Sequence, residues 1–203
     1  RGYVDEENTQ LSGAITIAEG KMRVVAKPGL ATKPLLRSNR GVFVGGQCAD
    51  TQASPELELE GVQLYVASDA SFKVGGGMTK NESANAPTPA LRLKDADVTC
   101  VYYPKFGDRT TTGITPTFSM TNSSFIGHVQ TYFGGAYGST SMRFEAIDSK
   151  FEVGDQILIT SGLSADVTNT IVSANDGKCG AFRAYNSYGS DRIAKGYFRL
   201  AAG

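Results

Sequence analysis

The chain has 203 residues, of which 40% are apolar, and its 20 basic side chains balance its 20 acidic ones. This length suits one domain or one elongated array of repeats, and the balanced charge favours neither nucleic acid nor an anionic membrane as a partner. No apolar stretch approaches the roughly 20 residues that a membrane-spanning helix needs, so we expect no membrane insertion.

The composition favours strands over helices. Twenty-four glycines accompany many Thr, Ser, Val and aromatic residues, and only residues 3–10 and 191–195 have a pattern that a short helical turn could share. The three cysteines, Cys48, Cys100 and Cys179, are widely spaced and odd in number. We therefore expect neither a zinc site nor a disulfide framework, and we interpret the cysteines as small buried residues.

A short pattern recurs along the chain. It consists of two apolar residues separated by one residue, then a turn of polar or small residues, then a returning apolar residue. The alternation predicts a strand with one buried face, and Asn, Asp, Gly and Ser supply the bend. The copies lie at 15–22, 35–42 (a weaker copy), 57–64, 91–98, 118–125 and 142–151, and we expect a further turn through 170–179. Their starts are 20 to 34 residues apart, which is the chain length that one coil of a three-sided solenoid uses.

The residues between the apolar ones fit a parallel register. If successive coils stack about 4.8 Å apart, Glu58 lies against Arg92 and Glu60 lies against Lys94. Opposite charges on adjacent strands stabilise such a register. The predicted inward column is apolar throughout and consists of Ile17, Leu59, Leu93, Met120 and Phe144.

These copies predict an all-β solenoid of about six to seven coils. They resemble the right-handed, single-chain parallel β-helix of the pectate-lyase type, and the stretches 121–125 and 146–151 are similar to coils of bacteriophage tailspikes and tail fibres. The resemblance covers roughly residues 14–185, and it implies a homotrimer on a virion tail or a cell surface. An antiparallel β-sandwich, which also has short strands and frequent turns, is the alternative fold.

We divide the chain into three segments. Residues 1–13 form an N-terminal cap or linker, residues 14–190 the solenoid, and residues 191–203 a C-terminal cap or connection. Caps are needed because the open end of a solenoid presents unpaired strand edges that recruit other chains. Because the sequence opens at Arg1, we expect it to be a piece of a longer protein.

Carboxylates provide the candidates for catalysis. Hydrolysis of a polysaccharide needs two carboxyl groups about 5 to 9.5 Å apart across a groove. Glu145 and Asp148 are the candidate pair, although turn aspartates ordinarily bond their own backbone. Further acidic residues close to turns or loops are Asp95, Asp97, Asp108 and Glu152. His128 is the single histidine and has no nucleophile motif beside it, so we expect no serine-hydrolase chemistry, no metal and no cofactor.

Tyrosines that follow several coil turns offer a candidate binding surface. Tyr has a flat apolar face and a hydroxyl, which suits both sugar rings and protein interfaces. The candidate ligand-binding residues are Tyr102, Tyr103, Tyr132 and Tyr137. Two alternatives remain: aromatic residues fill the solenoid interior, or exposed ones are covered in a trimer interface.

The sequence therefore predicts a structural or adhesion protein of a virion or cell surface, similar to a tailspike, that binds a host surface glycan or forms part of a fibre. One alternative is a glycoside hydrolase or lyase that cleaves surface polysaccharide. Another is a virion assembly component that binds no ligand. Because a fold does not fix a function, these alternatives stay open.

Overall fold

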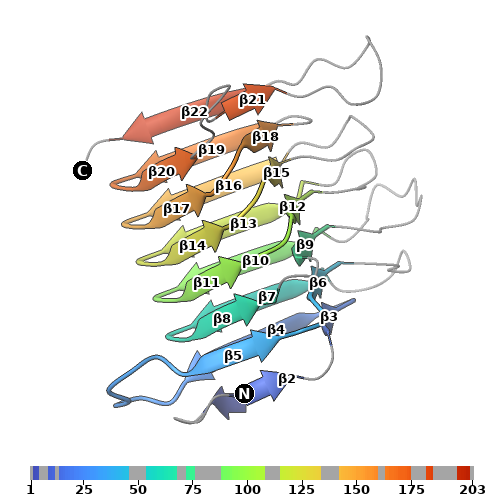
Figure 1. Ribbon diagram of the computed structural model, residues 1–203, viewed down its shortest axis with the longest axis vertical. Helices are drawn as coiled ribbons and strands as arrows, with labels where there is room; N and C mark the ends of the chain where they lie inside the picture. Colours follow the sequence, from blue (N-terminus) through green and yellow to red (C-terminus); the bar gives the residue numbers. More distant parts are fainter. Residues whose placement is uncertain are drawn as a thin grey trace.

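The computed structural model of the chain describes residues 2–4, 9–11, 14–45, 54–67, 72–75, 88–107, 115–133, 142–159, 163–174, 182–184 and 196–201. The regular elements in these residues are β-strands, and the strands form three parallel sheets. Figure 1 shows them stacked along the long axis of the molecule. The described residues contain no helix that is long and apolar enough to cross a membrane.

Each sheet takes one strand from every coil. Sheet A contains β1 (Gly2–Val4), β4 (Lys21–Ala26), β7 (Glu56–Glu60), β10 (Ala90–Lys94), β13 (Thr117–Thr121), β16 (Met142–Ile147), β19 (Leu163–Thr168) and β22 (Gly196–Ala201). Sheet B contains β2 (Thr9–Leu11), β5 (Leu35–Ser38), β8 (Gln63–Val66), β11 (Asp97–Cys100), β14 (Ser124–Gly127), β17 (Lys150–Val153) and β20 (Ile171–Ala174). Sheet C contains β3 (Ile15–Ile17), β6 (Val42–Val44), β9 (Phe72–Val74), β12 (Pro104–Phe106), β15 (Thr131–Phe133), β18 (Ile157–Ile159) and β21 (Phe182–Ala184).

The chain passes from sheet A to B to C and then begins the next coil, so the described strands form seven three-strand coils followed by β22. This confirms the predicted right-handed parallel β-helix. The antiparallel β-sandwich is wrong, because every strand pair is parallel. Strands β1, β2 and β22 extend these sheets into residues 1–13 and 191–203, and the role of those two segments as caps stays a prediction.

Alternation of apolar and polar residues builds the core. In β13, for example, Phe118 and Met120 are buried while the residues between and beside them face outward. The core of the fourth to sixth coils is aromatic: the rings of Phe125 and Phe151 stack with centroids 5.2 Å apart, as do those of Phe106 and Phe133. Such offset contacts between equivalent residues of successive coils stabilise the parallel register.

The centre of the predicted inward column is confirmed. Leu93 pairs in register with Leu59 on one side and with Met120 on the other. The outward pairs are confirmed as well, because β10 and β7 place Arg92 opposite Glu58. The sequence pattern therefore identifies the register of the middle coils correctly.

The two ends of that column are wrong. Ile17 lies in β3 of sheet C, where it pairs with Val44, and the copy at 35–42 begins in sheet B. Phe144 pairs with Phe118 and not with Met120, because β16 is six residues long and begins before the equivalent position of β13. All three sides of the solenoid share the same alternation, so alternation alone does not tell which side a strand belongs to.

The corner between sheets A and B, called here the A–B corner, has a regular two-residue turn in the third to seventh coils. The first turn residue has a positive φ in each: Gly61 (66°), Asp95 (46°), Asn122 (46°), Asp148 (49°) and Asn169 (44°). Asn and Asp tolerate this left-handed conformation better than other residues with side chains. In the second coil the corner is instead the eight-residue segment 27–34 between β4 and β5.

Candidate functional site

The predicted catalytic residues lie on different surfaces. Glu145 is in β16 on the outer face of sheet A, where it forms an ion pair with Arg143 of the same strand. Asp148 lies at the A–B corner and accepts a hydrogen bond of 2.6 Å from the Asn169 side chain. Asp148 lines the hollow described below, whereas Glu145 does not. Their role as a catalytic pair stays a prediction.

The other acidic candidates have neighbours of opposite charge. Asp95 and Asp97 share the ammonium group of Lys33, which lies 3.0 Å from an oxygen of each carboxylate. Glu152 lies 2.9 Å from the ammonium group of Lys150. Asp108 lies outside the described residues. His128 is exposed on the turn between β14 and β15.

Three of the four predicted ligand-binding tyrosines lie side by side. The rings of Tyr102 and Tyr103 are 4.7 Å apart edge to face, and the ring of Tyr103 is 6.4 Å from that of Tyr132. Tyr102 is 41% exposed, and Tyr103 and Tyr132 are half-buried. Tyr137 lies outside the described residues. The structure thus brings together three residues that come from two different coils.

The neighbours of these rings are polar. The ammonium group of Lys105 lies 5.5 Å from the centroid of the Tyr132 ring, within the range of a cation–π contact. The hydroxyl of Tyr132 donates a 3.0 Å hydrogen bond to the side-chain oxygen of Gln130. We call Tyr102, Tyr103, Tyr132, Lys105 and Gln130 the tyrosine patch.

The strands of sheet C explain why the patch faces outward. Lys105 of β12 pairs with Tyr132 of β15, and Phe106 pairs with Phe133. Because side chains alternate across a strand, the two phenylalanines enter the core and the other two residues face solvent. The expectation that aromatic residues fill the interior is therefore met by phenylalanines.

The turn that carries Tyr102 is tied to the core by Cys100. The thiol of Cys100 donates a 3.0 Å hydrogen bond to the carbonyl oxygen of Tyr102. Burial raises the pKa of this thiol to about 12. Cys100 therefore stays protonated near neutral pH and keeps its donor for the turn.

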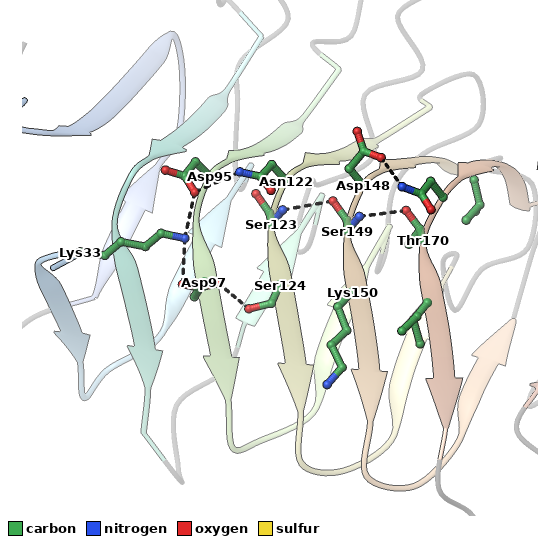
Figure 2. Close-up of a pocket in the computed structure, with 13 residues that line it drawn as sticks. Lys33, Asp95, Asp97, Asn122, Ser123, Ser124, Asp148, Ser149, Lys150 and Thr170 are labelled. Carbon is green, nitrogen blue, oxygen red and sulfur yellow. Dashed lines mark hydrogen bonds and ion pairs between the residues drawn. The ribbon is translucent and has the colours of Figure 1, made fainter. Parts of the chain in front are cut away.

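A hollow of about 880 Å³ runs along the A–B corner and is called here the corner groove. Side chains from the second coil and from the fourth to seventh coils line it. Figure 2 shows them arranged in rows across successive strands, with Lys33 at one end. The equivalent turn residue of the third coil is Gly61, whose missing Cβ would lie 3.1 Å from the Cβ of Ala26, so no side chain extends the row there.

Hydroxyl groups form the floor of the corner groove. Each hydroxyl donates to the carbonyl oxygen two residues earlier and accepts from a backbone N–H at the equivalent corner of the preceding coil. They belong to Ser123, Ser149 and Thr170, which donate at 2.7, 2.6 and 2.8 Å and accept at 3.1, 3.2 and 3.1 Å. The hydrogen bonds of the floor are thus made within the protein, and they fix the corner rigidly.

Carboxylates and amides alternate along the rim. The Asn122 amide donates to Asp95 at 3.3 Å, and the Asn169 amide donates to Asp148 at 2.6 Å (Figure 2). Alternation avoids stacking two carboxylates at the spacing of adjacent strands, where like charges destabilise. At the Lys33 end, burial lowers the pKa of Lys33, but its hydrogen bonds to Asp97 and Asp95 outweigh that effect and raise the pKa.

A third polar surface is the outer face of sheet A in the second to fourth coils. Glu58 is only 3% exposed. Its carboxylate lies 2.8 Å from Lys21, 2.9 Å from Arg23 and 3.1 Å from Lys94. Burial on its own raises the pKa of Glu58, but Lys21 and Lys94 together outweigh it and lower the pKa to about 2. The charged groups of this network are paired with one another within the protein.

No protein-family model, curated protein or solved structure matches this chain. In the part of the chain that the structure describes, no three His, Cys, Asp or Glu side chains are grouped so that they could hold a metal ion. The structure therefore defines the class of protein, a parallel β-helix, and its surfaces are the basis for a function.

The sequence did not predict the corner groove. In the sequence, the acidic residues of its rim are only separate catalytic candidates or turn formers, and Lys33 and Ile171 are not among the candidates. The available signal was the equivalent placement of Asp95, Asn122 and Asp148 in successive copies. Lys33 gave no signal, because it reaches the fourth coil from the second.

Proposed function

We propose that this chain is a rigid β-solenoid of a virion or cell surface that attaches to a surface polysaccharide through the tyrosine patch. The observation that carries the proposal is the cluster of Tyr102, Tyr103 and Tyr132, of which Tyr102 is 41% exposed. The homotrimer that the tailspike resemblance implies belongs to the same proposal.

The chemistry of the patch suits a sugar. Tyrosine rings offer flat apolar faces to the C–H groups of a pyranose, and their hydroxyls, with the amide of Gln130 and the ammonium of Lys105, offer hydrogen bonds to its hydroxyl groups. The side chains of Tyr132 and Lys105 project from adjacent strands of one sheet. A platform fixed by strands loses little conformational entropy when a ligand binds, which favours affinity.

Attachment is favoured over cleavage by the state of the carboxylates. Asp95 and Asp97 share Lys33, and Asp148 accepts from Asn169. Asp95, Asp148 and Asn169 hold left-handed turns at this corner, and Asp97 begins the following strand β11. Because these acids have contacts within the protein, we propose binding without hydrolysis.

Two substitutions test the proposal. Capsular and lipopolysaccharide glycans are screened for binding to the wild-type chain, and the glycan that binds is then titrated into Tyr102→Ala and Tyr132→Ala. We expect each variant to weaken binding at least tenfold, about 1.4 kcal/mol. The matched control is Tyr65→Ala, because Tyr65 is also a half-buried tyrosine on an outer face, where it contacts Arg37 at 5.1 Å.

The outcomes separate the alternatives. Loss of binding in the two patch variants with retention in Tyr65→Ala supports the proposal. Absence of glycan binding by the wild-type chain, or equal loss in all three variants, contradicts it. Release of new reducing ends or unsaturated products during the incubation replaces attachment with the enzymatic alternative.

A further inference from the structure

We infer that the corner groove is a second binding site, separate from the tyrosine patch, that takes a neutral glycan bearing acetamido groups. The groove lies between sheets A and B, whereas the tyrosine patch lies on sheet C and the turn before it. The inference therefore does not depend on the proposed function.

The hydroxyl groups of the floor are already hydrogen-bonded within the protein, so the residues of the rim would recognise a ligand. Ser123 and Ser149 already donate and accept within the protein and are at most 8% exposed. Asn122, Asp148 and Asn169 are exposed above them. An amide side chain has two donor hydrogens and two acceptor lone pairs, and Asn169 uses one donor on Asp148. The rim can therefore bond both the N–H and the C=O of an acetamido group.

An apolar residue stands beside these polar groups. Ile171, at the start of β20, is 60% exposed and lines the groove together with Val167. Ile171 stands at a row position that Asp97, Ser124 and Lys150 occupy in the three preceding coils, and β20 is the last described strand of sheet B, so its side chain has no neighbouring strand on one side. A methyl group or the apolar face of a sugar ring would cover it, as apolar contacts do in most ligand sites.

The charges of the lining disfavour an acidic ligand. The lining contains three carboxylates and two ammonium groups. Lys33 is bound by Asp95 and Asp97, and Lys150 lies 2.9 Å from Glu152. Among the described residues, the side-chain partner of Asp148 is the neutral amide of Asn169. A uronic or sialic acid in the groove would face this carboxylate, and like charges at close range repel.

The two ends of the groove give it a direction. Lys33, in the segment before β5, pairs with Asp95 and Asp97 of the fourth coil at one end of the groove (Figure 2). Ile171 belongs to the seventh coil, at the other end of the row of turns. A glycan chain would extend along the row of turns and leave at the Ile171 end. The acetamido group nearest that end would then contact Ile171 with its methyl group and Asn169 with its amide.

Calorimetric titration with three tetrasaccharides tests this inference on the whole chain. The probes are the β-1,4-linked N-acetylglucosamine tetramer, the β-1,4-linked glucose tetramer, which lacks the acetamido groups, and a galacturonic acid tetramer. We expect the acetylated tetramer to bind at least tenfold more tightly than the glucose tetramer, and the acidic tetramer not to bind.

Variants locate the binding. Ile171→Ser and Asn169→Gly should each weaken binding of the acetylated tetramer at least fivefold; glycine keeps the left-handed turn, as Gly61 does in the third coil. Ile147→Ser is the matched control, because Ile147 is 46% exposed but lies outside the groove. Tyr132→Ala should leave this binding unchanged even where it abolishes attachment through the tyrosine patch.

Several results would overturn the inference. They are equal affinity for the acetylated and the glucose tetramers, tighter binding of the acidic tetramer, no binding of any tetramer at millimolar concentration, and equal effects of Ile171→Ser and Ile147→Ser. Loss of binding in Tyr132→Ala alone would assign the ligand to the tyrosine patch and overturn the inference while leaving the proposed function standing.

Discussion

The carboxylates on two polar surfaces of the solenoid differ in burial and in pairing. On the outer face of sheet A, Glu58 is 3% exposed and lies among the cationic side chains of β4 and β10. At the corner groove, Asp148 is exposed and accepts from a single neighbouring amide. Carboxylates that are desolvated and paired hold adjacent coils together, whereas exposed and partly satisfied ones stay available to a ligand.

The largest expected difference between the two surfaces is in stability. Glu58→Ala should lower the free energy of unfolding by about 2 kcal/mol, because it removes charge-assisted contacts and leaves Lys21 and Arg23 without their central partner. Asp148→Asn, which keeps a side chain that tolerates the left-handed turn, should change it by less than about 0.5 kcal/mol. Urea unfolding of both variants measures this, and equal losses would remove the distinction.

The pH dependence sharpens the same comparison. The pKa of Glu58 is about 2 in the folded chain and about 4.3 in an unfolded one. A carboxyl group with a lowered folded pKa stabilises the fold fully above its unfolded pKa, and the stabilisation is lost as the pH falls from about 4.3 towards 2. Wild type should therefore lose more stability over this range than Glu58→Gln. Parallel curves for the two proteins would contradict the assignment.

A smaller effect is expected where the corner depends on backbone conformation. Asn122 has a φ of 46°, and a residue with a Cβ and no local hydrogen bond costs about 1 to 2 kcal/mol in this conformation. Asn122→Ala should lower stability by about 1 kcal/mol, and Asn122→Gly should be close to neutral. Thermal unfolding of Asn122→Ala and Asn122→Gly measures the cost of the left-handed backbone conformation. Equal melting temperatures for the two variants would show that this cost is absent.

The sequence predicted the solenoid because its middle coils are regular. Leu59, Leu93 and Met120 each precede a two-residue turn at an equivalent position, so their stacking follows from the sequence pattern. Ile17 was misplaced because the same alternation occurs on all three sides, and the segment 27–34 replaces the short turn that would have revealed the side. Local patterns thus predict that the chain forms coils. They do not predict the side on which a strand lies when a longer corner segment replaces the short turn, because the apolar alternation is the same on every side.

The surfaces were predicted unevenly for a related reason. Tyr102, Tyr103 and Tyr132 could be chosen because exposed aromatic residues after turns are visible in the sequence, and the structure places them together. The corner groove could not be chosen, because it combines turn residues with Lys33 from a distant coil. Such a contact depends on the path of one long segment, which no periodicity describes.

The smallest expected effect concerns the ion pairs of Lys33 at one end of the groove. Lys33→Ala should lower stability by less than about 1 kcal/mol, because partly exposed pairs contribute little, and the side chain of Asp95 is 57% exposed. The difference from wild type should shrink further in about 1 M salt, where charges are screened over roughly 3 Å. A larger loss of stability that salt does not change would show that the ion pairs of Lys33 contribute as the buried network of Glu58 does.

The account depends most on the tyrosine patch as the point of attachment. A crystal of the chain soaked with an oligosaccharide from the polysaccharide that it binds tests this directly. We predict a sugar ring against Tyr102 and Tyr132, with a hydroxyl within hydrogen-bonding distance of Lys105. A sugar bound only elsewhere, with these side chains bare, would contradict the account.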